Sequence, residues 1–110
     1  MVDSHQFILE ISAGVVEFML GAEDDPATVG NVDAVVTLND GTRWSATFLT
    51  LDEIARILDR WTTSGEGLGG SFFACPDLVI VRCRGIPAMV DVLEGLSKSN
   101  SIRTTLSPLT

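Results

Sequence analysis

The sequence predicts an α+β fold: a two-layer sandwich of a mostly antiparallel sheet with two helices on one face. Two β-hairpin patterns fill the first half of the chain, an amphipathic helix begins near Thr50, and a second helix with an apolar stripe follows a short apolar strand. A length of 110 residues suits one hydrophobic core. We therefore expect a single domain over 1–110, with flexible ends at about 1–5 and 107–110.

The first hairpin is predicted by alternation of apolar and polar residues over 6–20, around a turn of two or four residues at Ala13 and Gly14. Its apolar face combines Phe7, Leu9 and Ile11 with Val16, Phe18 and Leu20. Glu10 and Glu17 are expected to stand directly opposite each other, which is an unfavourable like-charge pair.

An exposed loop and a second hairpin come next. Residues 23–31, EDDPATVGN, combine acidic residues with Pro and Gly and indicate a loop. The turn of the hairpin falls at residues 39–41, and a two-residue turn would place Val36 opposite Ser45. A three-residue turn with Gly41 in the left-handed region pairs apolar residues throughout, namely Val36 with Trp44, Ala34 with Ala46 and Val32 with Phe48. This second register is preferred.

The first helix is predicted to begin after Thr50. A hydroxyl at this position and Glu53 three residues later match a capping box, in which the two side chains satisfy each other's backbone amides. One arc of the helix is apolar and consists of Leu51, Ile54, Ala55, Ile57, Leu58 and Trp61. Glycines at 65, 67, 69 and 70 end the helix between Thr63 and Gly65.

The last third of the chain is predicted to alternate strands with a second helix. Residues 71–74 and 78–84 indicate two strands or one interrupted strand, and 78–81 is apolar on both faces, as a central strand would be. Pro87 opens a helix whose buried stripe is Ile86, Met89, Val92, Leu93 and Leu96. Ile102, Thr104 and Leu106 alternate with polar residues and predict a last strand.

The charge of the chain limits its partners. Fifteen Asp and Glu residues against seven Lys and Arg give a net charge of −8, which repels nucleic acid and anionic membrane surfaces and attracts basic proteins. No apolar run approaches the ~18 residues that cross a bilayer, and no signal-peptide pattern opens the chain. We expect a cytoplasmic protein.

No pattern for metal, cofactor or catalysis is found. His5 is the only histidine, the spacing of Cys75 and Cys83 fits no zinc site, and no nucleophile has a base beside it. The glycine cluster 65–70 follows a helix instead of preceding one, so it indicates a helix stop and not a phosphate loop. A non-enzymatic chain without cofactor is expected.

The two thiols and two arginines of the last strand region need separate interpretations. Both cysteines are expected to be free thiols, Cys83 as a small buried apolar residue and Cys75 as the more accessible one. Arg82 and Arg84 share a strand face, where they either bind an anion or pair with a carboxylate such as Asp77, Glu66 or Asp91.

Residues 50–81 carry a resemblance. Thr50, Ile54, Leu58 and Trp61, followed by SGE at 64–66, LGG at 68–70, FF at 72–73 and DLVIV at 77–81, resemble a group of small bacterial proteins of uncharacterised function. Small acidic α+β proteins of this kind are similar to the immunity partners of bacterial toxins. The resemblance implies no catalytic residue.

The leading hypothesis is a protein-binding domain, in its most concrete form an immunity-type antitoxin that covers a basic toxin surface. Its binding carboxylates would be Asp52, Asp59 and Glu66 near the helix and glycine turn, and Glu23, Asp24 and Asp25 on the loop. The first alternative is a small-ligand or regulatory domain with a pocket of Trp61, Phe72 and Phe73 and with Arg82 or Glu66 as polar group. The second is a homodimer formed through a sheet edge or an exposed apolar face.

Overall fold

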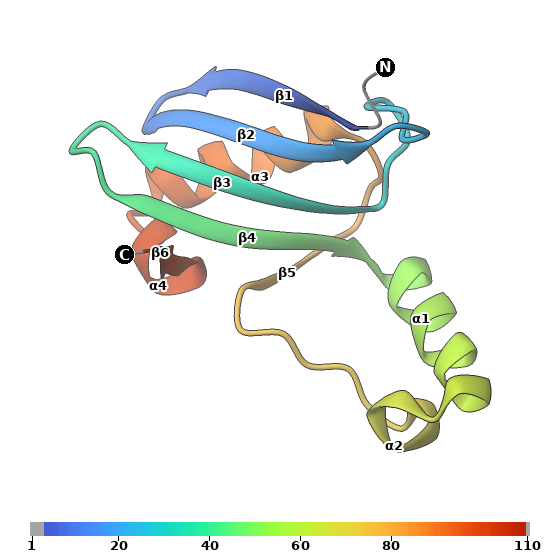
Figure 1. The fold of residues 1–110 in the computed structure, drawn as a ribbon. Coiled ribbons are helices and arrows are strands. Elements are labelled where there is room, and N and C mark those ends of the chain that lie inside the picture. The colour runs from blue at the N-terminus through green and yellow to red at the C-terminus, as the bar shows by residue number, and fades with distance from the viewer. Residues whose placement is uncertain (1–3, 110) are drawn as a thin grey trace.

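The structure is a computed structural model that describes residues 4–109, and within them it contains six strands and four helices (Figure 1). The strands are β1 (Ser4–Ile11), β2 (Gly14–Gly21), β3 (Asn31–Leu38), β4 (Arg43–Thr50), β5 (Leu78–Val81) and β6 (Ser107–Leu109). The helices are α1 (Leu51–Ser64), α2 (Glu66–Gly70), α3 (Ile86–Lys98) and α4 (Ile102–Thr105). The predicted α+β class is confirmed.

The strands form one mostly antiparallel sheet in the order β1-β2-β3-β4-β5. The first four strands follow each other as antiparallel neighbours, whereas β5 runs parallel to β4. The short β6 pairs with the opposite end of β4, at residues 43–45. Strand β1 therefore forms one edge of the sheet, and β5 and β6 share the other.

The first hairpin closes with a two-residue turn between Ile11 and Gly14. Phe7 lies opposite Phe18, as a shared apolar face requires. The expected pairing of Glu10 with Glu17 is wrong, because the turn lies one residue earlier, at Ser12 and Ala13, and this register places Val15 opposite Glu10. The like-charge pair is thereby avoided.

The second hairpin has the preferred three-residue turn. Val36 lies opposite Trp44, and the Ala34–Ala46 and Val32–Phe48 pairs follow. Gly41 has a φ of 88°, and its N–H donates to the carbonyl of Leu38. The positive φ explains why glycine occupies this position.

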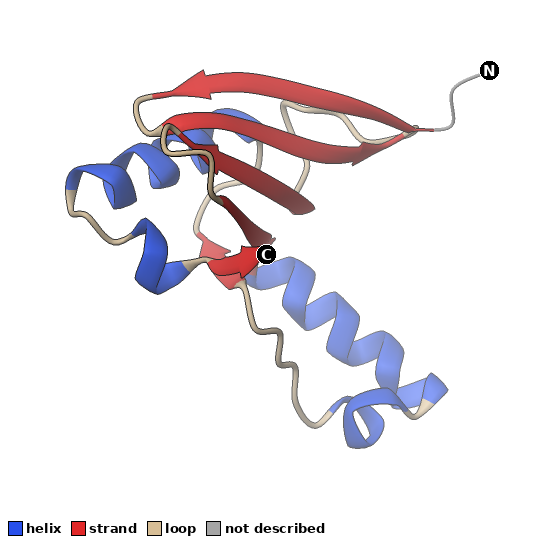
Figure 2. Cartoon of the chain, turned by 60° about the vertical axis from the view of Figure 1, so that its left-hand side comes forward, coloured by secondary structure: helices blue, strands red, loops and turns tan. Residues whose placement is uncertain are grey.

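The core lies between one face of the sheet and α3, with α4 beside it (Figure 2). Val16, Phe18, Val36 and Phe48 are fully buried on the sheet side, and Met89 and Leu93 are fully buried on α3. The helical stripe predicted for residues 86–96 is thus the inner face of the second layer.

Helix α1 departs from the end of β4, and with α2 it extends beyond the sheet (Figure 1, Figure 2). Of the two helices expected on one face, α3 lies there, while α1 contacts mainly α2. The expected apolar stripe of α1 is consequently only partly covered: Ile57 is buried, but Leu51 is 68% exposed. Gly65, with a φ of 90°, ends the helix where the sequence predicts.

Three expectations for the last third are wrong. Residues 71–74 form no strand, and 78–81 lies at the sheet's end instead of its centre, with Ile80 half exposed. Residues 102–105 are helical, because Ile102 and Leu106, one helical turn apart, both reach the core.

Ser107–Leu109, expected to fray, pairs with β4, and residues 4–5 already belong to β1. The remaining residues of the two predicted flexible ends, 1–3 and 110, lie outside the described residues.

Candidate functional site

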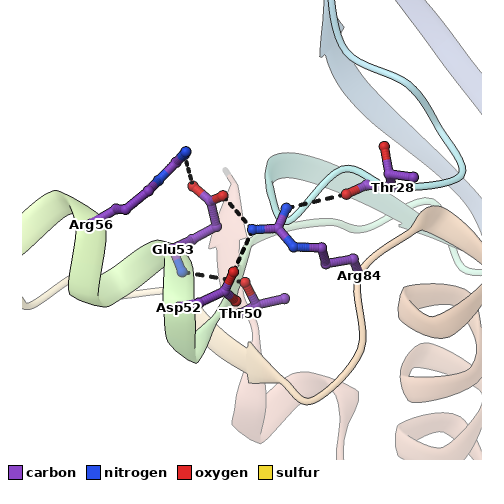
Figure 3. Close-up of polar contacts among 6 residues, drawn as sticks. All are labelled: Thr28, Thr50, Asp52, Glu53, Arg56 and Arg84. Atoms are coloured by element: carbon purple, nitrogen blue, oxygen red, sulfur yellow. Dashed lines mark hydrogen bonds and ion pairs between the residues drawn. The ribbon is translucent and has the colours of Figure 1, made fainter.

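A cluster of charged side chains joins the start of α1 to the chain that follows β5 (Figure 3). Arg84 donates from Nη2 to Oδ2 of Asp52 and to Oε2 of Glu53, each at 2.6 Å. Its Nη1 donates to the carbonyl oxygen of Thr28 at 3.2 Å, in the loop before β3. The guanidinium therefore holds three segments together. Arg84 is a paired cation, as one of the two interpretations expected, but its partners are Asp52 and Glu53 instead of Asp77, Glu66 or Asp91.

Glu53 is the buried member of this cluster, with 6% of its surface exposed. Its second oxygen, Oε1, accepts from Arg56 at 2.6 Å, one turn further along α1. Thr50 caps the helix by accepting from the Glu53 N–H at 3.4 Å. The reciprocal half of the predicted capping box is absent, because the Thr50 N–H donates to the carbonyl of Gly30 and the Glu53 carboxylate faces two arginines.

The charges in the cluster shift each other's pKa. Burial raises the pKa of Glu53, but hydrogen bonds from Arg84 and Arg56 outweigh burial and hold the pKa below its usual value. The Thr50 hydroxyl and Arg84 lower the pKa of Asp52 to about 2. Hydrogen bonds to Asp52 and Glu53 raise the pKa of Arg84. All three groups are therefore charged at neutral pH.

The acidic loop lies beside this cluster and shares a cavity of about 540 Å³ with it. Among the residues that line the cavity are Glu23, Asp24, Asp25, Glu53, Arg56 and Arg84. Asp24 accepts from the Gly21 N–H at 2.7 Å and Asp25 accepts from the Ala27 N–H at 2.9 Å, which fixes the course of the loop. Four carboxylates and two guanidinium groups thus meet in one concave surface.

The close approach of loop and cluster depends on Gly30. A Cβ atom at this position would lie 2.6 Å from Nη1 of Arg84 and 3.0 Å from a side-chain carbon of Glu53. A side chain at this position would displace the arginine from its bonds, so glycine allows the loop to approach the cluster this closely.

The structure divides the carboxylates that the sequence singled out. Asp52 accepts a hydrogen bond from Arg84, and Arg84 lines the same cavity as the loop residues 23–25. Asp59 and Glu66 lie further along α1 or beyond its end, and a helix of 14 residues spans about 20 Å. Glu66 accepts a hydrogen bond from the Ser64 hydroxyl at 3.1 Å. One acidic site therefore contains Asp52 and the loop, while Asp59 and Glu66 stand apart from it.

The aromatic residues of the alternative pocket lie at the far end of α1. Trp61 and Phe73 stack with ring centroids 5.6 Å apart, while Phe72 is half exposed. Arg82 follows β5, at the other end of the connecting segment. None of these four residues lines the cavity beside the acidic loop.

Asp77 fixes that connecting segment to β4. Its carboxylate accepts from the hydroxyls of Ser45 at 2.7 Å and Thr47 at 2.9 Å and from the Cys75 thiol at 3.0 Å. Burial raises the pKa of Asp77, but these hydrogen bonds outweigh it and lower the pKa. Cys75 is half-buried by this contact and Cys83 is exposed, so the predicted order of accessibility is wrong. Cys83 lies in the bend after β5, where its side chain leaves the core.

A second concave surface, which the sequence did not indicate, lies between β1 and α3. This groove has a volume of about 520 Å³. Its walls include Phe7 and Leu9 from β1, Pro26 and Ala27 from the loop, and Pro87 and Val90 from α3. Only the order of the strands, which periodicity does not reveal, shows that β1 and α3 border an open edge.

Comparison of the chain with protein-family models, with curated proteins and with solved structures gives no match. Within residues 4–109, no helix is both long and apolar enough to cross a membrane. The same part of the chain contains no group of three or more His, Cys, Asp or Glu side chains placed to hold a metal ion. The assignment of function therefore rests on the surfaces described above.

Proposed function

We propose that the chain is a non-enzymatic protein-binding domain whose acidic loop docks against a basic surface of a partner. The supporting observation is the placement of Glu23, Asp24 and Asp25 in the same cavity as the Arg84 cluster. The two arginines of that cavity are already engaged by Glu53 and Asp52. Within residues 4–109, the three loop carboxylates have no ion-pair partner, which leaves their charge available to basic groups of a partner.

The proposed form of this function is that of an immunity-type antitoxin, which acts in the cytoplasm by covering a basic surface of a toxin. A net charge of −8 accelerates the encounter with a basic protein. Because the loop charges are exposed, salt would weaken the attraction over a Debye length of about 8–10 Å. Glu53 and Arg84 have a positioning role here, since they hold the loop against α1.

The test compares two triple variants with equal charge. Glu23→Gln/Asp24→Asn/Asp25→Asn neutralises the loop and keeps the oxygen acceptors that shape it, whereas Asp33→Asn/Asp59→Asn/Glu66→Gln neutralises three carboxylates elsewhere. The wild-type chain is used to capture its partner from the cells that produce it, and the purified partner is titrated by calorimetry against all three forms. We expect the loop triple to bind at least about tenfold more weakly, equal to ~1.4 kcal/mol, and to be less sensitive to salt. Equal affinities of the two triples would contradict the proposal.

A second candidate, a homodimer, is favoured by apolar residues on the uncovered sheet face. Ile8 is 59% exposed there, and Val15 and Met19 on the neighbouring strand are also exposed. Light scattering at about 100 μM tests this candidate, because a specific dimer forms well below that concentration. A monomeric mass at this concentration excludes it.

A further inference from the structure

The edge of the sheet at β1 is open. β1 pairs with β2 over its whole length in an unbroken register, and on its other side no described strand pairs with it. In an antiparallel pair, every second residue directs its N–H and C=O away from the neighbour, so this edge offers a row of unpaired backbone groups. The strand contains no Pro, Lys or Arg, the residues that commonly protect an edge.

The groove between β1 and α3 runs beside this edge. Phe7 and Leu9 are half-buried on the groove side of β1, and Val90 is half-buried on α3 opposite them. A strand added to β1 would point alternate side chains to the same side as Phe7 and Leu9. Those side chains would enter the groove, whose walls are chiefly apolar, while the backbone bonds to the edge.

The charges around the groove select the occupant. Asp91 lies on the α3 wall of the groove, and within residues 4–109 it is in no ion pair. Asp25, in the acidic loop, directly precedes Pro26, which lines the groove. A second copy of this chain would bring the same carboxylates and a further charge of −8, whereas a basic segment would neutralise them.

We propose that the β1 edge and its groove bind an extended segment of a partner protein by strand addition. The segment is apolar at alternate positions and carries Arg or Lys at the end that meets the acidic loop. This inference rests on the proposed protein-binding function and defines the shape of the partner's bound segment. It also explains how one partner would engage the acidic loop and the sheet edge together.

The probe is a ten-residue acetylated peptide with valine at alternate positions, threonine between them and two arginines at one end. Amide spectra of the labelled protein are recorded during titration with the peptide. We expect shifts at Phe7, Leu9 and Val90, with slower hydrogen exchange of β1 amides and saturation below about 1 mM. A second copy at the edge would instead give a dimer by light scattering without peptide, which overturns the choice of occupant.

Two modified peptides test the backbone contact without altering the protein. One is N-methylated at its valines and the other at its threonines, so each blocks the donors on one edge of the added strand. Because only one edge faces β1, we expect one peptide to lose at least about tenfold in affinity and the other to bind as before. Equal behaviour of the two peptides, or no shift at β1 at about 1 mM unmodified peptide, overturns strand addition.

Two protein variants test the groove. Val90→Trp fills it, whereas Val15→Trp adds the same ring on the opposite face of the sheet. We expect only the first to weaken binding of the peptide, by about tenfold or more. Equal affinities of the two variants would rule out the groove.

Failure here is distinct from failure of the proposed function. If the loop triple weakens the affinity for a captured partner but Val90→Trp does not, the docking function stands and strand addition is wrong. If the peptide binds as described and the loop triple leaves partner affinity unchanged, the edge is a binding site and the acidic docking surface is wrong.

Discussion

Replacing Glu53 by glutamine should test the role of the Arg84 cluster in stability. The variant keeps the size of a side chain that is 6% exposed but removes the negative charge that accepts from Arg84 and Arg56 at 2.6 Å. Hydrogen bonds to charged groups contribute about 1.5–3 kcal/mol each, and part of this is offset because the buried charge no longer has to be desolvated. We expect a net loss of about 1–2 kcal/mol at neutral pH, with a melting temperature lower by about 4–8 °C per kcal/mol.

The effect should depend on pH in a defined direction. A free glutamate titrates near 4.5, and the pKa of Glu53 is lower in the folded protein. The charged cluster therefore contributes its full stability above about pH 4.5, and this contribution is lost as pH falls through the lower, folded pKa. We expect the difference between wild type and Glu53→Gln to be largest at about pH 7 and to shrink as the pH approaches about 3.

Urea unfolding at the two pH values measures these differences. Asp59→Asn is the matched control, because it removes one charge from the exposed side of the same helix and should change stability by no more than about 0.5 kcal/mol. A difference for Glu53→Gln that equals the control, or that is the same at both pH values, would refute the assignment of the cluster as a stabilising contact.

Three further changes probe the fold. Thr50→Val keeps the shape of the N-cap residue but removes the oxygen that accepts from the first turn, so thermal unfolding should show a loss of about 1 kcal/mol; an unchanged midpoint would contradict the cap. Gly67→Ala should destabilise by more than about 1 kcal/mol in the same assay, because a Cβ would lie 2.6 Å from the Trp61 ring at a φ of +57°; a neutral effect would mean that the turn has another conformation. In the native protein a thiol reagent should modify Cys83 faster than Cys75, which mass spectrometry of the labelled peptides can follow; the reverse order would contradict the bond from Cys75 to Asp77.

The sequence allowed prediction of features that depend on neighbouring residues. The turn at Gly41 and the start of α1 at Thr50 follow from local backbone requirements, and both are confirmed. The burial of Met89 follows from the helical period and is also confirmed. These signals act over a few residues and require no knowledge of the strand order.

Features that depend on distant contacts were not predictable. Arg84 pairs with residues 31 and 32 positions away, and no pattern ranks these carboxylates above Asp77 or Glu66. Residues 102–106 were assigned to the wrong element because Ile102 and Leu106 fit both a strand and a helical turn, and packing against the core decides between them. The groove at β1 likewise depends on which strand lies at the edge.

The glycine-rich turn after α1 has a consequence for the chirality of this chain. Gly67, Leu68 and Gly69 follow one another with φ values of 57°, 53° and 70°, which is the mirror image of an ordinary helical turn. Such a backbone conformation costs an L-residue roughly 1–2 kcal/mol but carries no steric cost for glycine, because glycine is achiral and has no Cβ. The glycines on either side of Leu68 thus allow a chain built only from L-residues to form one left-handed helical turn. A D-alanine at position 69 would suit the φ of 70° there better than L-alanine would.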